Sequence, residues 1–272
     1  MPSDYMLKRK KLRTTGLPGA VATLATNTGI WFTQPEPGRT LGIDVSHWSG
    51  IVDWDVAKAA GIKFALIKYM DGILPSDFAE INYAGALHAG ILVGSYQWLR
   101  SEISEGRQAK EYAAMLRNMP VDIPPAVDYE ASFRGKRYDP NLNNLWSMIT
   151  PLQMLVQRQL MVYTSIGFWG DHGSLSMLYG RCALWQAQYK VKQPAKMLPW
   201  SGWDIWQFTE TGEGARFGVP KFGERAVDLN YFRGTVDELL VWCGKDPQDE
   251  RYSSLRGQAL PASRSSQTRR PA

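Results

Sequence analysis

Short apolar runs alternate along the first half of the chain with longer segments whose apolar residues recur at helical spacing. The apolar runs predict four strands, at residues 41–45, 63–69, 91–96 and 125–130. The segments between them predict three helices, at residues 54–60, 78–89 and 105–119. Asp53 and Asp77 are suited to cap the first two helices, and Gly61 and Gly90 to end them. This alternation is typical of βα units in a parallel sheet.

The second half continues the pattern with fewer helices. Four more apolar runs predict strands, at residues 160–164, 183–189, 203–208 and 226–232. Asp139 and Pro140 are suited to start a helix over 141–158, which Pro151 should kink or split. The remaining connections are rich in Gly, Pro and Trp. Eight strands in 272 residues predict a single TIM-barrel-like α/β barrel that is helix-poor in its second half.

The net charge of +5 is concentrated at the two ends of the chain. Residues 1–40 carry +4 and residues 245–272 carry +3, so the middle is mildly acidic at −2. The last residues are rich in Ser, Arg, Gln and Pro, a composition typical of segments that do not fold alone. We therefore expect a basic N-terminal extension at 1–38, a barrel at 39–245 and a disordered basic tail at 246–272. The basic ends either solubilise the protein or attract nucleic acid, another anionic polymer or a membrane surface.

Cysteine usage and hydropathy narrow the class of protein further. Cys182 and Cys243 form no CxxC pair and there is no histidine cluster, so no metal site is expected. The sequence does not decide whether the two cysteines form one disulfide or remain free thiols. No run of 18 apolar residues is present, so no transmembrane segment is expected. A basic cluster precedes an interrupted apolar stretch near the N-terminus, which leaves an export signal open. The acidic middle lacks a basic stripe, which argues against nucleic-acid binding.

Four carboxylates lie at the ends of predicted strands. Asp44 ends the first strand, Asp128 and Glu130 end the fourth, and Asp228 ends the eighth. Residues two apart on a strand point to the same face, and the carboxyl ends of barrel strands converge on one mouth. Taken singly, each acid could serve only to cap a turn or to bind backbone. Together they predict one acidic cleft.

Clustered carboxylates point to glycoside hydrolysis. Repulsion between them raises the pKa of at least one, which supplies a general acid near neutral pH, while an ionised partner stabilises positive charge that develops on the sugar. Aromatic residues at the same strand ends can stack on sugar rings, although barrel packing is expected to account for about half of them. These aromatic residues are Tyr96, Trp98, Tyr163, Trp185 and Tyr189.

Eight short motifs follow one another between Leu41 and Phe232. They are GIDVSHWSGIVDW, AGIKFALIKY, AGILVGSYQW, PAVDYE, VYTS, LWQAQY, WDIWQF and VDLNYF. In this order they resemble the signatures of glycoside hydrolase family 25, the Chalaropsis-type lysozymes. The resemblance implies a flattened, irregular β/α barrel.

The resemblance also implies a reaction and its site residues. Glu130 matches the general acid, and the other cleft carboxylates are Asp44, Asp128 and Asp228. The implied reaction cleaves the β-1,4 bond between N-acetylmuramic acid and N-acetylglucosamine in bacterial peptidoglycan, without a cofactor. The Asp-x-Glu spacing suggests a retaining route in which Asp128 orients the N-acetyl group of the substrate. We expect a monomer that acts on the cell wall after secretion or delivery by a phage.

The chain departs from the family pattern after its second strand. Met70, Asp71 and Gly72 stand where many members have Thr-Glu-Gly, and SYQW stands where AYHF is frequent. Neither change removes a matched acid, but both leave the shape of the saccharide subsites open. The altered loop and the basic ends motivate an alternative, a non-catalytic cell-wall-binding protein on the same barrel.

Overall fold

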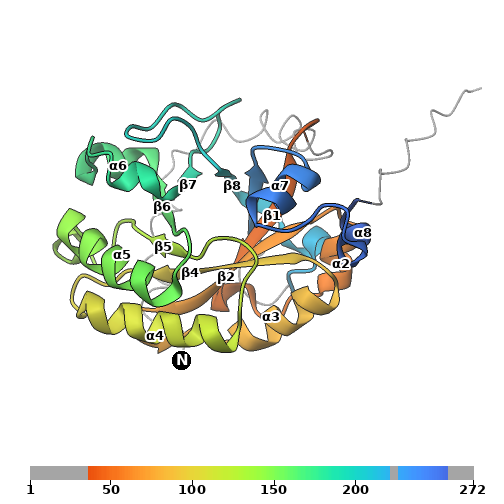
Figure 1. Cartoon of the computed structure of the whole chain (residues 1–272), viewed down its shortest axis with the longest axis horizontal. Coiled ribbons are helices and arrows are strands. Elements are labelled where there is room, and N and C mark those ends of the chain that lie inside the picture. Colours follow the sequence, from red (N-terminus) through yellow and green to blue (C-terminus); the bar gives the residue numbers. More distant parts are fainter. Residues whose placement is uncertain (1–35, 221–225, 257–272) are drawn as a thin grey trace, which may run out of the picture.

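The computed structural model describes residues 36–220 and 226–256, and its helices and strands lie in these two segments (Figure 1). The strands are β1 (Thr40–Val45), β2 (Phe64–Asp71), β3 (Leu74–Pro75), β4 (Leu92–Trp98), β5 (Ala126–Asp128), β6 (Met161–Ser165), β7 (Ala183–Ala187), β8 (Ile205–Glu213) and β9 (Ala226–Phe232). The α-helices are α2 (Trp54–Ala59), α3 (Ala79–His88), α4 (Glu105–Asn118), α5 (Leu142–Val156), α6 (Ile166–His172), α7 (Val236–Trp242) and α8 (Ser253–Arg256). Short 3-10 helices are η1 (His47–Ser49), η2 (Lys136–Tyr138), η3 (Tyr179–Arg181), η4 (Gly214–Phe217) and η5 (Glu250–Tyr252).

Eight strands close into a barrel, as the sequence predicts. They are hydrogen-bonded in the order β1, β9, β8, β7, β6, β5, β4 and β2, and a pairing of β1 with β2 closes the ring. β3 adds a short antiparallel hairpin to β2. β9 runs antiparallel to both of its neighbours, β1 and β8, so the expectation of parallel strands throughout is wrong for the last one. The described residues between β8 and β9 form only the 3-10 helix η4 and no α-helix that could carry the chain back for a parallel crossover, which favours an antiparallel return.

The second half of the barrel carries less helix, in agreement with the sequence. α3, α4 and α5 have 10, 14 and 15 residues and cover one side of the barrel (Figure 1). α6 and α7 have only seven residues each, and the described residues between β7 and β8 form no α-helix.

Several helix boundaries follow from local signals in the sequence. The Asp53 side chain caps α2 by accepting a hydrogen bond from the backbone N–H of Val56 at 3.1 Å, as predicted. Gly61 and Gly90 follow the last residues of α2 and α3 with φ of +95° and +71°. These values lie in the left-handed region that glycine tolerates, which explains why both helices stop there.

Other helix boundaries differ from the predictions. α3 begins after Phe78, which is in the left-handed conformation, and Asp77 does not cap it. α5 is capped by Asn141 rather than Asp139, because the Asn141 side chain accepts hydrogen bonds from two backbone N–H groups of the first turn. Pro151 lies inside α5 without splitting it, since apolar residues on both sides are buried and hold the helix against the barrel.

The barrel strands are buried on both faces, which explains their continuous apolar runs. Two strand glycines are required by the packing. A Cβ atom on Gly42 would lie 2.5 Å from the Phe64 ring, and one on Gly94 would lie 2.5 Å from Leu66. Phe64 and Leu66 are fully buried in the barrel core, so neither can move aside easily.

The folded domain extends beyond Lys245, where the sequence places the start of a disordered tail. η5 and α8 follow that residue, and Leu255 of α8 is 2% exposed and packs in a buried cluster with Leu239 and Leu240 of α7. The expected tail boundary is therefore wrong for residues 246–256. The rest of the tail and residues 1–35 of the N-terminal extension lie outside the described residues. None of the helices in the described segments has the length and apolarity needed to cross a membrane.

Candidate active site

The four predicted acids line one cleft at the mouth of the barrel. The cleft has a volume of about 640 Å³. Its lining residues are Asp44, Ser46, His47, Trp48, Lys68, Asp71, Tyr96, Trp98, Asp128, Glu130, Phe133, Tyr163, Trp185, Tyr189, Gln207, Glu210 and Asp228. Asp71, Trp98 and Asp128 are the last residues of β2, β4 and β5, so the cleft opens at the carboxyl ends of the parallel strands.

Asp228 reaches this cleft by a different route from the one the sequence predicts. It is the third residue of β9 and does not end its strand. Because β9 is antiparallel to β1, the start of β9 lies beside the end of β1, and Asp228 is directly opposite Asp44 in the register. The prediction that the two acids meet is confirmed, although the predicted strand direction is wrong.

Asp44 is buried and held by two amide side chains. Its Oδ2 accepts hydrogen bonds from Gln207 Nε2 at 2.8 Å and from Asn230 Nδ2 at 2.7 Å. Burial raises the pKa of Asp44 to about 6, although the hydrogen bonds with Asn230, Gln207 and Asp228 counteract this rise. The carboxyl group of Asp44 therefore changes charge near neutral pH.

Asp128 and Glu130 lie together in the cleft, as their spacing predicts. Asp128 is 3% exposed, and its Oδ1 has no hydrogen-bond partner among the described residues. Burial, followed by the nearby charge of Glu130, raises the pKa of Asp128 well above its usual value, whereas the charge of Lys68 lowers it. Glu130 is half-buried and therefore open to a ligand in the cleft. The pair places a deeply buried acid next to a more accessible one.

Comparison with known proteins assigns the chain that forms this cleft to a family. The family model for glycosyl hydrolases family 25 matches residues 43–216. Lysozyme M1 from Streptomyces globisporus is 30% identical over 211 residues, which are 74% of this chain and 70% of that protein. The chain belongs to glycosyl hydrolase family 25. It is therefore a glycoside hydrolase of the lysozyme kind, as the ordered motifs predict.

Solved structures share the fold of this family 25 member. The bacterial lysozyme from Streptomyces coelicolor superposes with a TM-score of 0.67 at 26% identity, over 77% of this chain and 98% of that one. A family GH25 lysozyme from Aspergillus fumigatus has the same fold, with a TM-score of 0.64 at 23% identity over 75% of this chain and 99% of that one.

The five predicted aromatic residues all line the cleft, but they divide into two groups. Tyr96, Tyr163 and Trp185 are at most 7% exposed and pack against one another, with Trp185 at 5.6 Å from Tyr96 and 4.5 Å from Tyr163 between ring centroids. Trp98 and Tyr189 are half-buried. The first three rings therefore build the floor, and the last two present surface on which a sugar ring can stack.

Two polar residues that hold Asp44 were missed from the sequence. Gln207 Oε1 accepts hydrogen bonds from the hydroxyls of Tyr163 at 2.9 Å and Tyr189 at 2.5 Å, while its Nε2 donates to Asp44 and lies 3.4 Å from Asp228. Asn230 Oδ1 accepts from the indole of Trp185 at 2.8 Å while its Nδ2 binds Asp44. Both lie in motifs quoted above, but a neutral amide inside an apolar strand carries no charge pattern to reveal its role.

A second set of missed residues contains the cation Lys68 and its partner Asp71. Lys68 lies in β2 and is 5% exposed, with Nζ 3.4 Å from Asp71 Oδ2. Burial alone would raise the pKa of Asp71, but the hydrogen bond and charge of Arg100 and the charge of Lys68 lower it below its usual value. The departure from the family pattern at residues 70–72 was the sequence signal that could have revealed Asp71. Its partner Arg100 could not be recognised in this way, because it lies 29 residues further along the chain.

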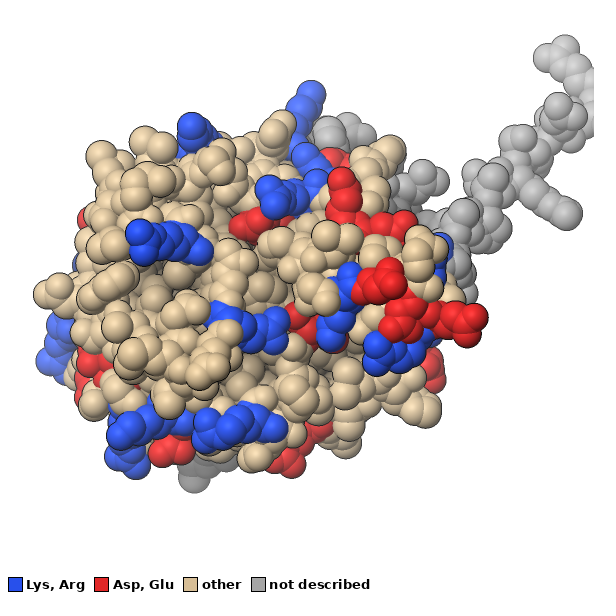
Figure 2. Space-filling view, in the orientation of Figure 1, with Lys and Arg blue, Asp and Glu red and all other residues tan. Residues whose placement is uncertain are grey.

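Three further features of the described residues concern metal ligands, surface charge and the cysteines. No group of three or more His, Cys, Asp or Glu residues in this part of the chain is arranged to hold a metal ion. Basic side chains are dispersed among acidic ones on the face drawn in Figure 2, and acidic side chains gather on the side where α2 and α8 lie. Cys182 and Cys243 are free thiols, which resolves the alternative left open by the sequence.

Proposed function

We propose that this protein is an N-acetylmuramidase that cleaves the β-1,4 bond between N-acetylmuramic acid and N-acetylglucosamine in bacterial peptidoglycan. The observation that carries the proposal is the pairing of buried Asp128 with half-buried Glu130 in one aromatic-lined cleft. Membership of a glycoside hydrolase family and its similarity to lysozymes, among them an autolytic lysozyme from Clostridium acetobutylicum, support the choice of substrate. The proposed site of action is the cell wall.

The proposed route is retaining and assisted by the substrate. Glu130 protonates the leaving glycosidic oxygen, and the oxygen of the substrate's N-acetyl group attacks the anomeric carbon. Asp128 accepts the N–H of that acetamido group and stabilises the positive charge of the cyclic intermediate. Water then opens the intermediate, with Glu130 acting as base. Asp44 and Asp228 lie opposite each other in the cleft and add negative charge beside the sugar that becomes positively charged.

Two kinds of residue support this assignment of roles. The half-buried rings of Trp98 and Tyr189 offer apolar faces to the sugar, while Gln207 and Asn230 hold the Asp44 carboxylate in one orientation. Preorganised groups of this kind cost little rearrangement when charge develops in the transition state. No part of the proposed route requires a cofactor.

The proposal is tested by lysis of purified cell walls with Glu130→Gln as the variant. Both turbidity and newly formed reducing ends are measured, and Glu111→Gln on the exposed surface of α4 is the matched control because it removes the same charge. Glu130→Gln should lose nearly all release of reducing ends, and Glu111→Gln should retain it. Binding of walls by the wild-type protein without new reducing ends would instead favour the non-catalytic wall-binding alternative.

A further inference from the structure

Phe133 is an aromatic residue of the cleft that the proposed route does not use. It follows Glu130 by three residues, in the connection after β5, and it is 43% exposed. Of the aromatic residues that line the cleft in the described part of the chain, Phe133 alone is exposed. Its ring centroid is 6.3 Å from that of Trp98, with 62° between the two ring planes. The two rings therefore form a corner of the cleft, and Phe133 lies at its outer edge.

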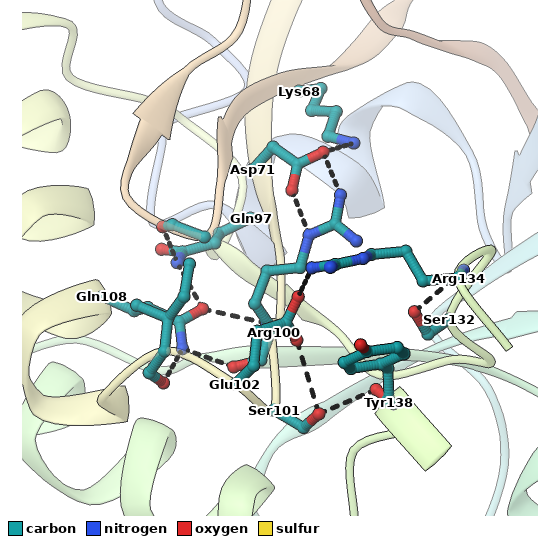
Figure 3. Close-up of polar contacts among 12 residues, drawn as sticks. Lys68, Asp71, Gln97, Arg100, Ser101, Glu102, Gln108, Ser132, Arg134 and Tyr138 are labelled. Carbon is teal, nitrogen blue, oxygen red and sulfur yellow. Dashed lines mark hydrogen bonds and ion pairs between the residues drawn. The ribbon is translucent and has the colours of Figure 1, made fainter. Parts of the chain in front are cut away.

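The Phe133 ring rests on the guanidinium group of Arg100. The guanidinium carbon is 4.4 Å from the ring centre, within the range of a cation–π contact. Arg100 is 8% exposed, and the Asp71 carboxylate binds it through Nε and through Nη2, the latter at 2.7 Å (Figure 3). Gln108 accepts from the Arg100 N–H at 3.0 Å and donates to the Arg100 carbonyl at 2.8 Å. The support behind the ring is therefore fixed at both its side chain and its backbone.

The loop that carries this ring, residues 131–139, is tied to the segment that follows β4. Arg134 Nη1 forms an ion pair with Glu102 Oε1 at 2.5 Å, and the Ser101 hydroxyl donates to the Tyr138 carbonyl at 2.8 Å (Figure 3). The guanidinium carbon of Arg134 also lies 4.4 Å from the centre of the Tyr138 ring. An exposed ion pair alone contributes little, but these contacts together hold the loop in one position.

A fixed and exposed aromatic ring is suited to bind the apolar face of a sugar. The ring loses little conformational freedom on binding, because its position is set before the ligand arrives. Single exposed apolar residues are common on protein surfaces and by themselves indicate nothing. Phe133 differs because it lines a cleft with two catalytic carboxylates and has a built support. The reacting groups of Asp128 and Glu130 are engaged by the cleaved bond, so a ring at the outer edge is available to a neighbouring sugar.

We propose that Phe133, together with Trp98, binds a sugar residue next to the two sugars joined by the cleaved bond. The ligand is the apolar face of an N-acetylhexosamine ring in the same glycan chain. Arg100 and Arg134 are positioning residues that hold Phe133 in place. The proposal rests on the proposed function, because the cleft must hold a glycan. It also gives a role to Asp71, the acid of the altered turn, which acts through Arg100.

The first test measures kcat and KM of the full chain on soluble peptidoglycan fragments several sugars long. Phe133→Ala should raise KM about tenfold, as expected when roughly half of the burial of a Phe side chain is lost, and should change kcat by less than about twofold. Phe133→Trp keeps an aromatic face and should retain a KM close to that of the wild type. Phe78→Ala is the matched control, because Phe78 is 44% exposed and does not line the cleft.

The second test reads binding without turnover. Calorimetry measures the Kd of the same fragments for Glu130→Gln and for the double variant that also carries Phe133→Ala. The double variant should bind about tenfold more weakly. Phe133→Gln replaces Phe133→Ala if urea denaturation shows that the Ala variant is not folded. This readout remains decisive if the wild-type protein releases no reducing ends, an outcome that defeats the proposed function alone.

The third test examines the positioning role of Arg134. Arg134→Met should raise KM less than Phe133→Ala does, because the ion pair that it removes is partly exposed. In the Phe133→Ala background it should have no further effect, since no ring is left to position. Arg137→Met removes the same charge from the same loop but leaves the ion pair with Glu102, and it should leave KM unchanged.

Four results would overturn parts of this proposal. Unchanged KM and Kd in a folded Phe133→Ala variant, or no binding of the fragments by Glu130→Gln, would exclude the sugar site. A fall in kcat with an unchanged KM would make the loop a support for Glu130. Equal effects of Arg134→Met with and without the Phe133 ring would remove the positioning role of Arg134.

Discussion

Replacing Asp44 with Asn should make the folded protein more stable at neutral pH, although it should weaken catalysis. Asp44 is 7% exposed, and burial raises its pKa from 3.8 to about 6. The folded protein therefore binds a proton at Asp44 more tightly than the unfolded chain does. Asn keeps an oxygen that can accept the hydrogen bonds of Gln207 and Asn230, but it does not ionise.

The size and sign of this effect follow from the pKa difference. One pKa unit corresponds to about 1.36 kcal/mol, so a rise of roughly two units costs about 3 kcal/mol once the pH exceeds both values. Because the native state binds more protons, the free energy of unfolding falls as pH rises from about 4 to about 6. This loss of stability is absent at a pH below the pKa of Asp44 in the unfolded chain. It is fully present at a pH above the pKa of Asp44 in the folded protein.

Urea denaturation between pH 4 and pH 8 measures this cost. The difference in free energy of unfolding between Asp44→Asn and wild type should grow in favour of the variant by up to about 3 kcal/mol over this range. Glu111→Gln, which removes an exposed carboxylate, should show no such trend. A difference that stays constant with pH would refute the claim that Asp44 is held with a raised pKa.

Three further results are expected. Gln207→Leu removes a hydrogen bond to buried Asp44, and a bond of this kind to a charged group contributes about 1.5–3 kcal/mol. The rate at which reducing ends are released should therefore fall about tenfold or more. An unchanged rate would show that Gln207 has no role in the site. Gly42→Ala should lower the free energy of unfolding by about 1–3 kcal/mol in urea, because its Cβ would meet Phe64; equal stability would show that the strand can shift. Lysis of intact walls should weaken between 0.1 and 1 M salt, as the Debye length falls from about 10 to about 3 Å, whereas turnover on soluble fragments should change less; equal salt dependence would argue against wall capture by the basic ends.

The barrel and its acids could be predicted because both depend on local sequence. Apolar runs bounded by Gly and capping residues mark strands that alternate with helices, and an acid directly after such a run falls at the mouth of the barrel. Asp44 and Asp128 follow this rule. Asp228 reached the same cleft although the direction of its strand was predicted wrongly, because strand direction depends on the connection before it.

The side chains that hold the acids in place could not be predicted, because each of these contacts joins two residues that are far apart in the sequence. Gln207 and Asp44 are 163 residues apart, and their hydrogen bond exists only once the barrel closes. The pair of Asp71 and Arg100 spans 29 residues and joins the ends of the neighbouring strands β2 and β4. Neither pair leaves a periodic signal. The helix starts at Phe78 and Asn141 were also missed, because neighbouring residues compete for the capping position and tertiary packing decides between them.

The stereochemistry of the first product tests the central claim most directly. Proton NMR during early turnover of soluble peptidoglycan fragments reads the anomer of the newly formed reducing end before it equilibrates. The substrate-assisted route through Glu130 and Asp128 predicts that the β anomer appears first. An α anomer appearing first would mean that a carboxylate activates water directly, and it would contradict the roles assigned to both residues.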